Sequence, residues 1–99
     1  MLHMEKKNDG AHLTVTLAGH LDAVSAPELE TGLLASLDGV TELLIDLEKL
    51  EYISSAGLRV LLSAQKIMKR QGEMKVAHVN ETVREIFDVT GFTDILSIE

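Results

Sequence analysis

Three strands are predicted from the spacing of apolar residues in the first half of the chain. Apolar side chains recur at every second position between residues 11 and 18, as in a strand that is buried on one face only. The segment 3–7 can pair with it as a hairpin, because Asn8-Asp9-Gly10 has the residue types that tight reversals favour. A nearly continuous apolar run at 42–47 predicts a central strand with helices on either side of it.

The first predicted helix lies between these strands. Ser25 and Glu28 have the spacing of a capping box, and Pro27 falls in the first turn, where its missing N–H group is not needed. The helix is expected to run to about Leu37, with a buried stripe of leucines four residues apart. Gly32 is expected at a point of close packing, because glycine is otherwise unfavourable inside a helix.

The second half of the chain continues the alternation of helices and strands. Residues 57–68 carry apolar side chains at the spacing of one helix face. A further strand is predicted at 74–79, followed by a helix that Asn80 caps and Gly91 ends. The segment 94–98 fits either an edge strand or a short helix.

This order of elements predicts a single α/β domain over residues 1–99. Strands that alternate with helices favour right-handed crossovers, and hence a mixed, largely parallel sheet of four or five strands flanked by three or four helices. In such sheets functional sites usually lie beyond the carboxyl ends of the strands. The segments 19–24, 46–55 and 78–80 are therefore expected at one edge of the sheet.

The composition narrows the range of functions. The formal net charge is −7, which argues against binding to a nucleic-acid backbone. No apolar run is long enough to cross a membrane and the N-terminus lacks the apolar core of a signal peptide, so we expect a cytoplasmic protein. There is no cysteine, and the histidines are scattered without metal-ligand spacing, so neither a metal nor another cofactor is predicted.

The stretch between the central strand and the following helix contains two adjacent hydroxyls, Ser54 and Ser55. The start of a helix leaves backbone N–H groups unpaired and carries the positive end of the helix dipole, so an anion is stabilised there. Ser55 is therefore a candidate for phosphorylation, with Ser54 as the alternative. Serine is also favoured as an N-cap, so capping alone is a second interpretation of the pair.

Charged residues are predicted around this serine. Asp22 and Asp46 should be neighbours of Ser55 at the edge of the sheet, although each also fits a solvated or capping carboxylate. Arg59, one turn further along the helix, fits either a partner for the phosphate or an ordinary surface charge.

Small and apolar residues complete the candidate site. Gly57 is expected to allow close packing where the chain turns into the helix. Leu58 and Leu62 flank the predicted buried stripe, where they would be partly exposed. They are candidate apolar contacts for a protein partner.

Four stretches follow one another in order along nearly the whole chain: Gly19-His20-Leu21-Asp22 with the Ser25-Ala26-Pro27 helix start, Leu44-Ile45-Asp46-Leu47, Ser54-Ser55-Ala56-Gly57-Leu58, and Ile86-Phe87-Asp88-Val89-Thr90-Gly91-Phe92. Together they resemble the STAS domain, and more narrowly the stand-alone bacterial anti-sigma factor antagonists. The resemblance implies the STAS fold. Many family members carry an acidic residue immediately before the phosphorylated serine, where this chain has Ser54.

The resemblance also implies a function and partners. The unphosphorylated protein would bind an anti-sigma factor serine/threonine kinase and so free a sigma factor. The kinase would phosphorylate Ser55 and release the complex, and a serine phosphatase would reset it.

Two other functions fit the same residues. His20, Asp22 and Ser55 have the chemistry of a base, an orienting carboxylate and a nucleophile, but Ile53-Ser54-Ser55-Ala56-Gly57 is not the G-x-S-x-G elbow of hydrolases, so an enzyme is not expected. The same fold without the switch would make the chain an interaction subunit of another regulatory, secretion or transport system, without sigma-factor control.

Overall fold

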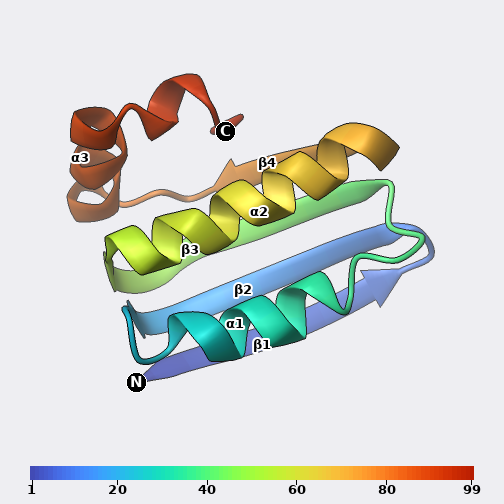
Figure 1. Cartoon of the computed structure of the whole chain (residues 1–99), viewed down its shortest axis with the longest axis horizontal. Helices are drawn as coiled ribbons and strands as arrows, with labels where there is room; N and C mark the ends of the chain where they lie inside the picture. The colour runs from blue at the N-terminus through green and yellow to red at the C-terminus, as the bar shows by residue number, and fades with distance from the viewer.

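The computed structural model describes residues 1–99 and contains one four-stranded sheet in the order β1-β2-β3-β4 (Figure 1). β1 (Leu2–Asp9) pairs antiparallel with β2 (His12–Leu21), which confirms the predicted hairpin. β3 (Glu42–Ile53) is parallel to β2, and β4 (Glu73–Ala77) is parallel to β3. The predicted mixed, largely parallel α/β fold is confirmed.

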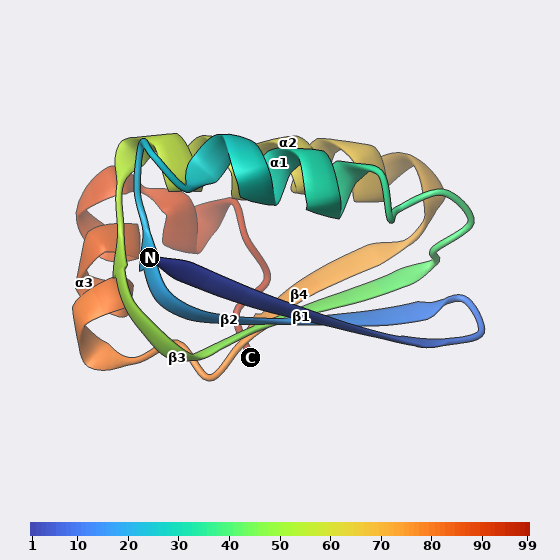
Figure 2. The ribbon, with the colours of Figure 1, turned by 90° about the horizontal axis from the view of Figure 1, so that it is seen from below.

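Three α-helices alternate with these strands: α1 (Ala26–Leu34), α2 (Ser55–Gln71) and α3 (Glu81–Thr90). Figure 2 shows α1 and α2 side by side on one face of the sheet, while α3 lies at one end, beside the bent second half of β3. The expectation of helices on both sides of β3 is therefore wrong for α1 and α2, which cover the same face of the sheet (Figure 2). The opposite face of the sheet, called the open face below, carries polar and half-buried side chains such as Thr14 and Leu44.

The core lies between the sheet and the helices. Twenty-four buried apolar residues form one cluster that joins the strands to α1, α2 and α3. Phe87 of α3 is its only aromatic member, so the packing rests on aliphatic side chains. A Cβ atom on Gly32 would lie 2.8 Å from the Met4 Cε atom, which confirms close packing between α1 and β1 at this glycine.

Several element boundaries differ from the prediction. α1 ends at Leu34, before Leu37, although the Leu37 side chain is buried as expected. β3 continues to Ile53, well beyond the apolar run at 42–47. The last segment forms a 3₁₀ turn, Phe92–Asp94, and a single bridge between Ile98 and Val76, so it is neither a full strand nor an α-helix.

The predicted ends of α3 are confirmed. The Val83 N–H donates to the Asn80 side chain at 2.9 Å, and Gly91 takes a φ of +81° at the C-cap, a conformation that glycine adopts without strain. No helix in the structure combines the length and the apolar character that crossing a membrane requires.

Candidate functional site

The carboxyl ends of β2 and β3 lie side by side and position the two serines. Leu21 is the register partner of Ile53, and the Ser54 N–H donates to the Leu21 carbonyl at 2.8 Å. The Ser54 carbonyl accepts the Leu58 N–H at 3.0 Å and so begins the hydrogen bonding of α2. A single residue, Ser54, therefore separates β3 from α2, and the start of the helix is held rigidly at the edge of the sheet.

The two hydroxyls have different environments. The Ser54 Oγ atom is shielded from solvent and makes no hydrogen bond, whereas Ser55 is exposed in the first turn of α2. Ser54 occupies the N-cap position with an extended backbone, but its side chain makes no capping hydrogen bond. The interpretation of the pair as a conventional side-chain cap is therefore wrong.

The start of α2 is electrostatically suited to an anion. Its first turn contains no acidic residue, while its last turn carries Lys69 and Arg70, which complement the negative end of the dipole. Arg59 is exposed, and its guanidinium makes no hydrogen bond or ion pair within the chain. A negative charge on Ser55 would meet unpaired backbone N–H groups and no neighbouring carboxylate from its own helical turn.

Gly57 brings α2 close to β2 and β3, as predicted. A Cβ atom at this position would lie 2.5 Å from Leu21 Cγ and 2.9 Å from Ile53 Cγ1. Both of these side chains are fully buried. Only a residue without a side chain allows this separation between the helix and the strand ends.

Leu58 and Leu62 differ in exposure. Leu58 is buried in the core with 3 % of its surface exposed, so the prediction that it is partly exposed and available to a partner is wrong. Leu62 is half-buried, as predicted. The buried face of α2 is wider than the predicted stripe because the helix packs against both the sheet and α1.

Asp22 organises the loop between β2 and α1. Its Oδ1 atom accepts the Val24 and Ser25 N–H groups, each at 3.0 Å. The Ser25 hydroxyl accepts the Asp22 N–H at 3.0 Å and donates to the His20 carbonyl at 2.9 Å, and it makes no helix-capping bond. The predicted capping box is therefore wrong. Asp22 instead caps backbone N–H groups of its own loop, directly after Leu21, whose carbonyl accepts the Ser54 N–H.

The pKa of Asp22 reflects these bonds. The Ser25 N–H, followed by smaller contributions that include the Val24 N–H and the Ser25 hydroxyl, holds the pKa of the Asp22 carboxyl below its usual value, against a desolvation effect that raises it. Asp22 is therefore fully ionised near neutral pH. It adds a fixed negative charge near the site.

Asp46 lies elsewhere. In the strand register it is opposite Thr16 and Ala77, whereas the serines follow Ile53 at the far end of the same strand. Its Oδ1 atom instead pairs with His78 Nδ1 at 3.1 Å, and chiefly through this hydrogen bond the pKa of His78 is raised. The prediction that Asp46 neighbours Ser55 is wrong, because β3 extends further past Asp46 than the apolar run indicated.

Two exposed apolar side chains at the same strand ends escaped the sequence reasoning. Val24, in the loop that Asp22 organises, is 89 % exposed, and Tyr52, one residue before the end of β3, is 45 % exposed. Large exposed apolar side chains beside a functional group are typical of a protein-binding surface. The sequence signal was an aromatic residue one position before Ile53 and a valine two positions after Asp22.

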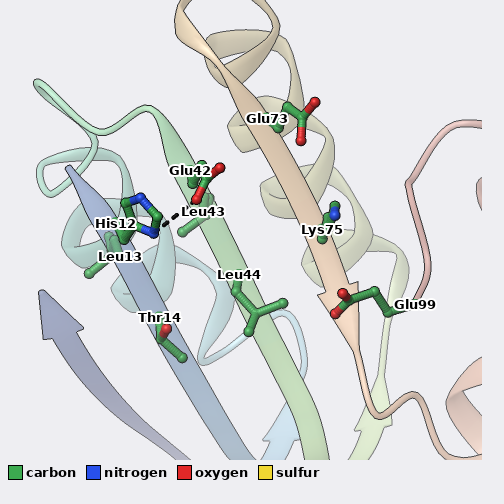
Figure 3. Close-up of a pocket in the computed structure, with 9 residues that line it drawn as sticks. All are labelled: His12, Leu13, Thr14, Glu42, Leu43, Leu44, Glu73, Lys75 and Glu99. Carbon is green, nitrogen blue, oxygen red and sulfur yellow. Dashed lines mark ion pairs between the residues drawn. The ribbon is translucent and has the colours of Figure 1, made fainter. Parts of the chain in front are cut away.

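A shallow cavity of about 260 Å³ lies on the open face of the sheet, near the starts of β3 and β4 (Figure 3). Its wall includes the ion pair between His12 Nδ1 and Glu42 Oε2, at 2.8 Å, together with Glu73, Lys75 and Glu99. None of its lining residues belongs to the serine region. The cavity is therefore separate from the candidate site.

Comparison with protein families identifies the class of protein. The family model for the STAS domain matches residues 3–99, so the chain belongs to the STAS domain family. The resemblance inferred from four short stretches is thereby confirmed over nearly the whole chain.

Individual relatives agree with this assignment. The chain is 40% identical over 94 residues to BtrV of Bordetella bronchiseptica, covering 93% of this chain and 80% of that protein. It is 32% identical over 98 residues to the anti-sigma-B factor antagonist of Bacillus subtilis, covering 98% of this chain and 90% of the relative. These relatives have the names of regulatory binding proteins, not of enzymes.

The fold is also that of SpoIIAA, an anti-sigma factor antagonist solved in two states. The unphosphorylated form superposes with a TM-score of 0.85 at 17% identity, covering 98% of this chain and 88% of SpoIIAA. The phosphorylated Bacillus form gives a TM-score of 0.76 at 16% identity, covering 98% of this chain and 91% of that one.

Proposed function

We propose that the chain is an anti-sigma factor antagonist whose binding to an anti-sigma factor serine kinase is switched off by phosphorylation of Ser55. Its membership of the STAS family and the names of its relatives support the general role. The observation that carries the specific site is the contrast between the exposed Ser55 and the buried hydroxyl of Ser54. A kinase can reach only the first of these without unfolding the start of α2.

The start of α2 can hold the modification without a change of fold. A phosphate adds about 1.5 to 2 negative charges and three strong acceptor oxygens. The unpaired N–H groups of the first helical turn and the positive end of the dipole stabilise that charge locally. Arg59 lies one turn along the same helix, with its guanidinium unpaired, and can add a further contact.

The same charge would disrupt a docked complex. The ends of β2 and β3, where Ser55 follows, also carry the exposed Val24 and Tyr52, which supply apolar contacts for the kinase, and the ionised Asp22. Burying a phosphate among these groups without a new cation costs several kcal/mol, and a loss of about 1.4 kcal/mol already weakens binding tenfold. Phosphorylation therefore releases the kinase, and removal of the phosphate by a serine phosphatase restores binding.

The acceptor is tested by peptide-level mass spectrometry. The partner kinase, captured from the native cell with the unphosphorylated chain, is purified and supplied with ATP. We expect one phosphate per chain, on Ser55, and none in Ser55→Ala. Phosphate transfer to Ser55→Ala at the wild-type rate would contradict the proposal.

Ser54→Ala is the matched control. It removes the neighbouring hydroxyl, which is buried and unbonded, so the fold should be retained and phosphorylation should continue. If instead Ser54→Ala abolished the modification while its unfolding curve matched that of the wild type, Ser54 would be the acceptor.

A further inference from the structure

Three potential metal ligands meet on the open face of the sheet, apart from the serines. Asp46 and Glu48 of β3 and His78, which follows β4, have ligand atoms that all lie within 4.8 Å of one another. We propose that Asp46, Glu48 and His78 bind a divalent transition-metal ion such as Zn²⁺. The proposal is independent of the phosphorylation switch.

The fold itself brings these residues together. Asp46 and Glu48 are two positions apart on β3, at a register shift where Asp46 Oδ1 accepts the Glu48 N–H at 3.0 Å, and their ligand atoms lie within 4.8 Å of each other. The parallel register places Ala77 opposite Asp46, and His78 follows directly. The backbone of His78 has a φ of +56°, the only positive value outside glycine in this chain. The strand register thus aligns residues that the sequence separates by about thirty positions.

The hydrogen bonds leave ligand atoms available. Asp46 Oδ1 accepts the Glu48 N–H at 3.0 Å and pairs with His78 Nδ1 at 3.1 Å, while its Oδ2 atom makes no hydrogen bond. The Glu48 carboxylate and His78 Nε2 make no hydrogen bond or ion pair either. The Asp46 side chain is only 22% exposed, so its carboxylate is held in place by its surroundings.

The separations fit a small ion. Zn²⁺ binds nitrogen and oxygen ligands at about 2.0–2.2 Å, so two ligands of a tetrahedral site lie about 3.3 Å apart. Asp46 Oδ1 and His78 Nδ1 are already 3.1 Å apart, and binding exchanges their mutual hydrogen bond for bonds from both atoms to the ion. Glu48 is exposed, and its ligand atom lies within 4.8 Å of those of the other two residues.

The ligand set selects a class of ion. Imidazole with carboxylates suits zinc and neighbouring transition metals, whereas Mg²⁺ and Ca²⁺ prefer sites made of oxygen alone. This inference departs from the sequence prediction of no metal, which considered the histidines only by their spacing along the chain.

A second histidine–carboxylate pair provides a matched control. His12 Nδ1 and Glu42 Oε2 are 2.8 Å apart on the open face of the sheet (Figure 3). No third ligand joins this pair, because the only group of three or more potential ligands in the chain is the one at His78. His12→Gln therefore removes an imidazole without touching the proposed site.

The test is a titration of the full, tag-free chain with Zn²⁺ in a metal-free buffer at about pH 7.5. Amide ¹H–¹⁵N spectra locate the site and calorimetry gives the affinity. We expect one ion per chain, with shifts concentrated at residues 46–48 and 76–79 that EDTA reverses.

Variants of His78 and Glu48 test whether these residues bind the ion. His78→Asn keeps a residue that tolerates positive φ, and Glu48→Gln changes only an exposed side chain, so each should fold. Each should weaken Zn²⁺ binding by at least about tenfold, since replacing even a residue that only orients a metal ligand lowers metal affinity by about that factor. His12→Gln should bind as the wild type does. Should His78→Asn fail to fold, Glu48→Gln alone decides.

Three results would overturn the proposal. The first is the absence of saturable Zn²⁺ binding up to millimolar concentration. The second is an equal loss of affinity in His12→Gln and Glu48→Gln. The third is equal binding of Mg²⁺ at the same residues, which would make the cluster a non-specific acidic surface.

Discussion

At the scale of single residues, Gly57 determines how closely α2 approaches the ends of β2 and β3. The nearest atoms to a Cβ at this position belong to Leu21 and Ile53, which are fully buried and cannot rotate toward solvent. The position of the start of α2, and with it that of Ser55, therefore depends on the lack of a side chain at Gly57.

Gly57→Ala should consequently destabilise the protein. Overpacking a buried contact costs about 1–3 kcal/mol, while replacing glycine by alanine in a helix gains at most about 1 kcal/mol. We expect a net loss of about 1 kcal/mol in the free energy of unfolding, measured by urea titration.

Gly32→Ala is the control for this substitution. Its added Cβ would meet the end of the flexible Met4 side chain, which can move aside, so this variant should be as stable as the wild type or more stable. Equal destabilisation by both substitutions would show that helix glycines here matter for another reason.

The two serines show what sequence can and cannot establish at this scale. The pattern of a strand followed by a helix correctly placed both hydroxyls at a helix start. It could not distinguish them, because whether Ser54 Oγ is buried depends on where the Leu21 carbonyl holds the backbone. It also overestimated the exposure of Leu58, because it does not show that α2 packs against both the sheet and α1.

At the scale of elements, the loop between β2 and α1 depends on an ionised carboxylate. Asp22 accepts the two backbone N–H groups of Val24 and Ser25, and its pKa is lowered chiefly by the second of these. The sequence suggested a capping box at Ser25 instead, because it does not show that the His20 carbonyl and the Asp22 N–H engage the Ser25 hydroxyl first.

The stability that Asp22 gives this loop should decrease in acid. Because the pKa of Asp22 is lower in the folded chain than its usual 3.8, its contribution to stability is fully present above that value and is lost as the pH falls through the folded pKa. Asp22→Asn should be less stable than the wild type at neutral pH. The difference in unfolding free energy between the two proteins should shrink as the pH falls below 3.8.

Asp38→Asn serves as the comparison for this pH series. Asp38 is exposed and its carboxylate accepts no hydrogen bond, so its replacement should change stability little at any pH. A gap between wild type and Asp22→Asn that stayed constant from neutral to acid pH would show that the charge of Asp22 contributes nothing.

The order of the elements followed from periodicity, but their lengths and curvature did not. β3 extends to Ile53 because Leu50 and Ile53 continue its buried face after a break in simple alternation. Register irregularities near Ala18 and His20 accompany the bend of the paired strands (Figure 2). These features depend on pairing between strands, which the sequence of one strand does not contain.

At the scale of the whole molecule, the length of β3 separates the predicted site residues into two groups. Asp22 and the serines lie at the carboxyl end of the sheet, whereas Asp46 joins His78 further back along β3. Topology predicted which strand ends meet, because parallel neighbours share an edge. The topology could not place Asp46, because the distance of Asp46 from the strand end depends on how many residues of β3 follow the apolar run.

The proposed switch acts through charge on a fold that does not change. The chain already has a net charge of −7. Ser55 is exposed, and its hydroxyl makes no hydrogen bond within the chain. Ser55→Ala and Ser55→Asp should therefore unfold at nearly the same denaturant concentration as the wild type. Any difference in partner binding then reports the interface and not the fold.

Ser55→Asp should weaken binding of the purified anti-sigma factor kinase by at least about tenfold in a calorimetric titration, because an uncompensated charge becomes buried in the complex. Ser55→Ala should bind as the wild type does. Thr41→Asp adds the same charge just before β3, at the opposite end of this strand from Ser55, and should leave affinity unchanged. Equal weakening by Ser55→Asp and Thr41→Asp would assign the effect to net charge. Unchanged binding by Ser55→Asp would show that a single negative charge at the start of α2 does not release the partner.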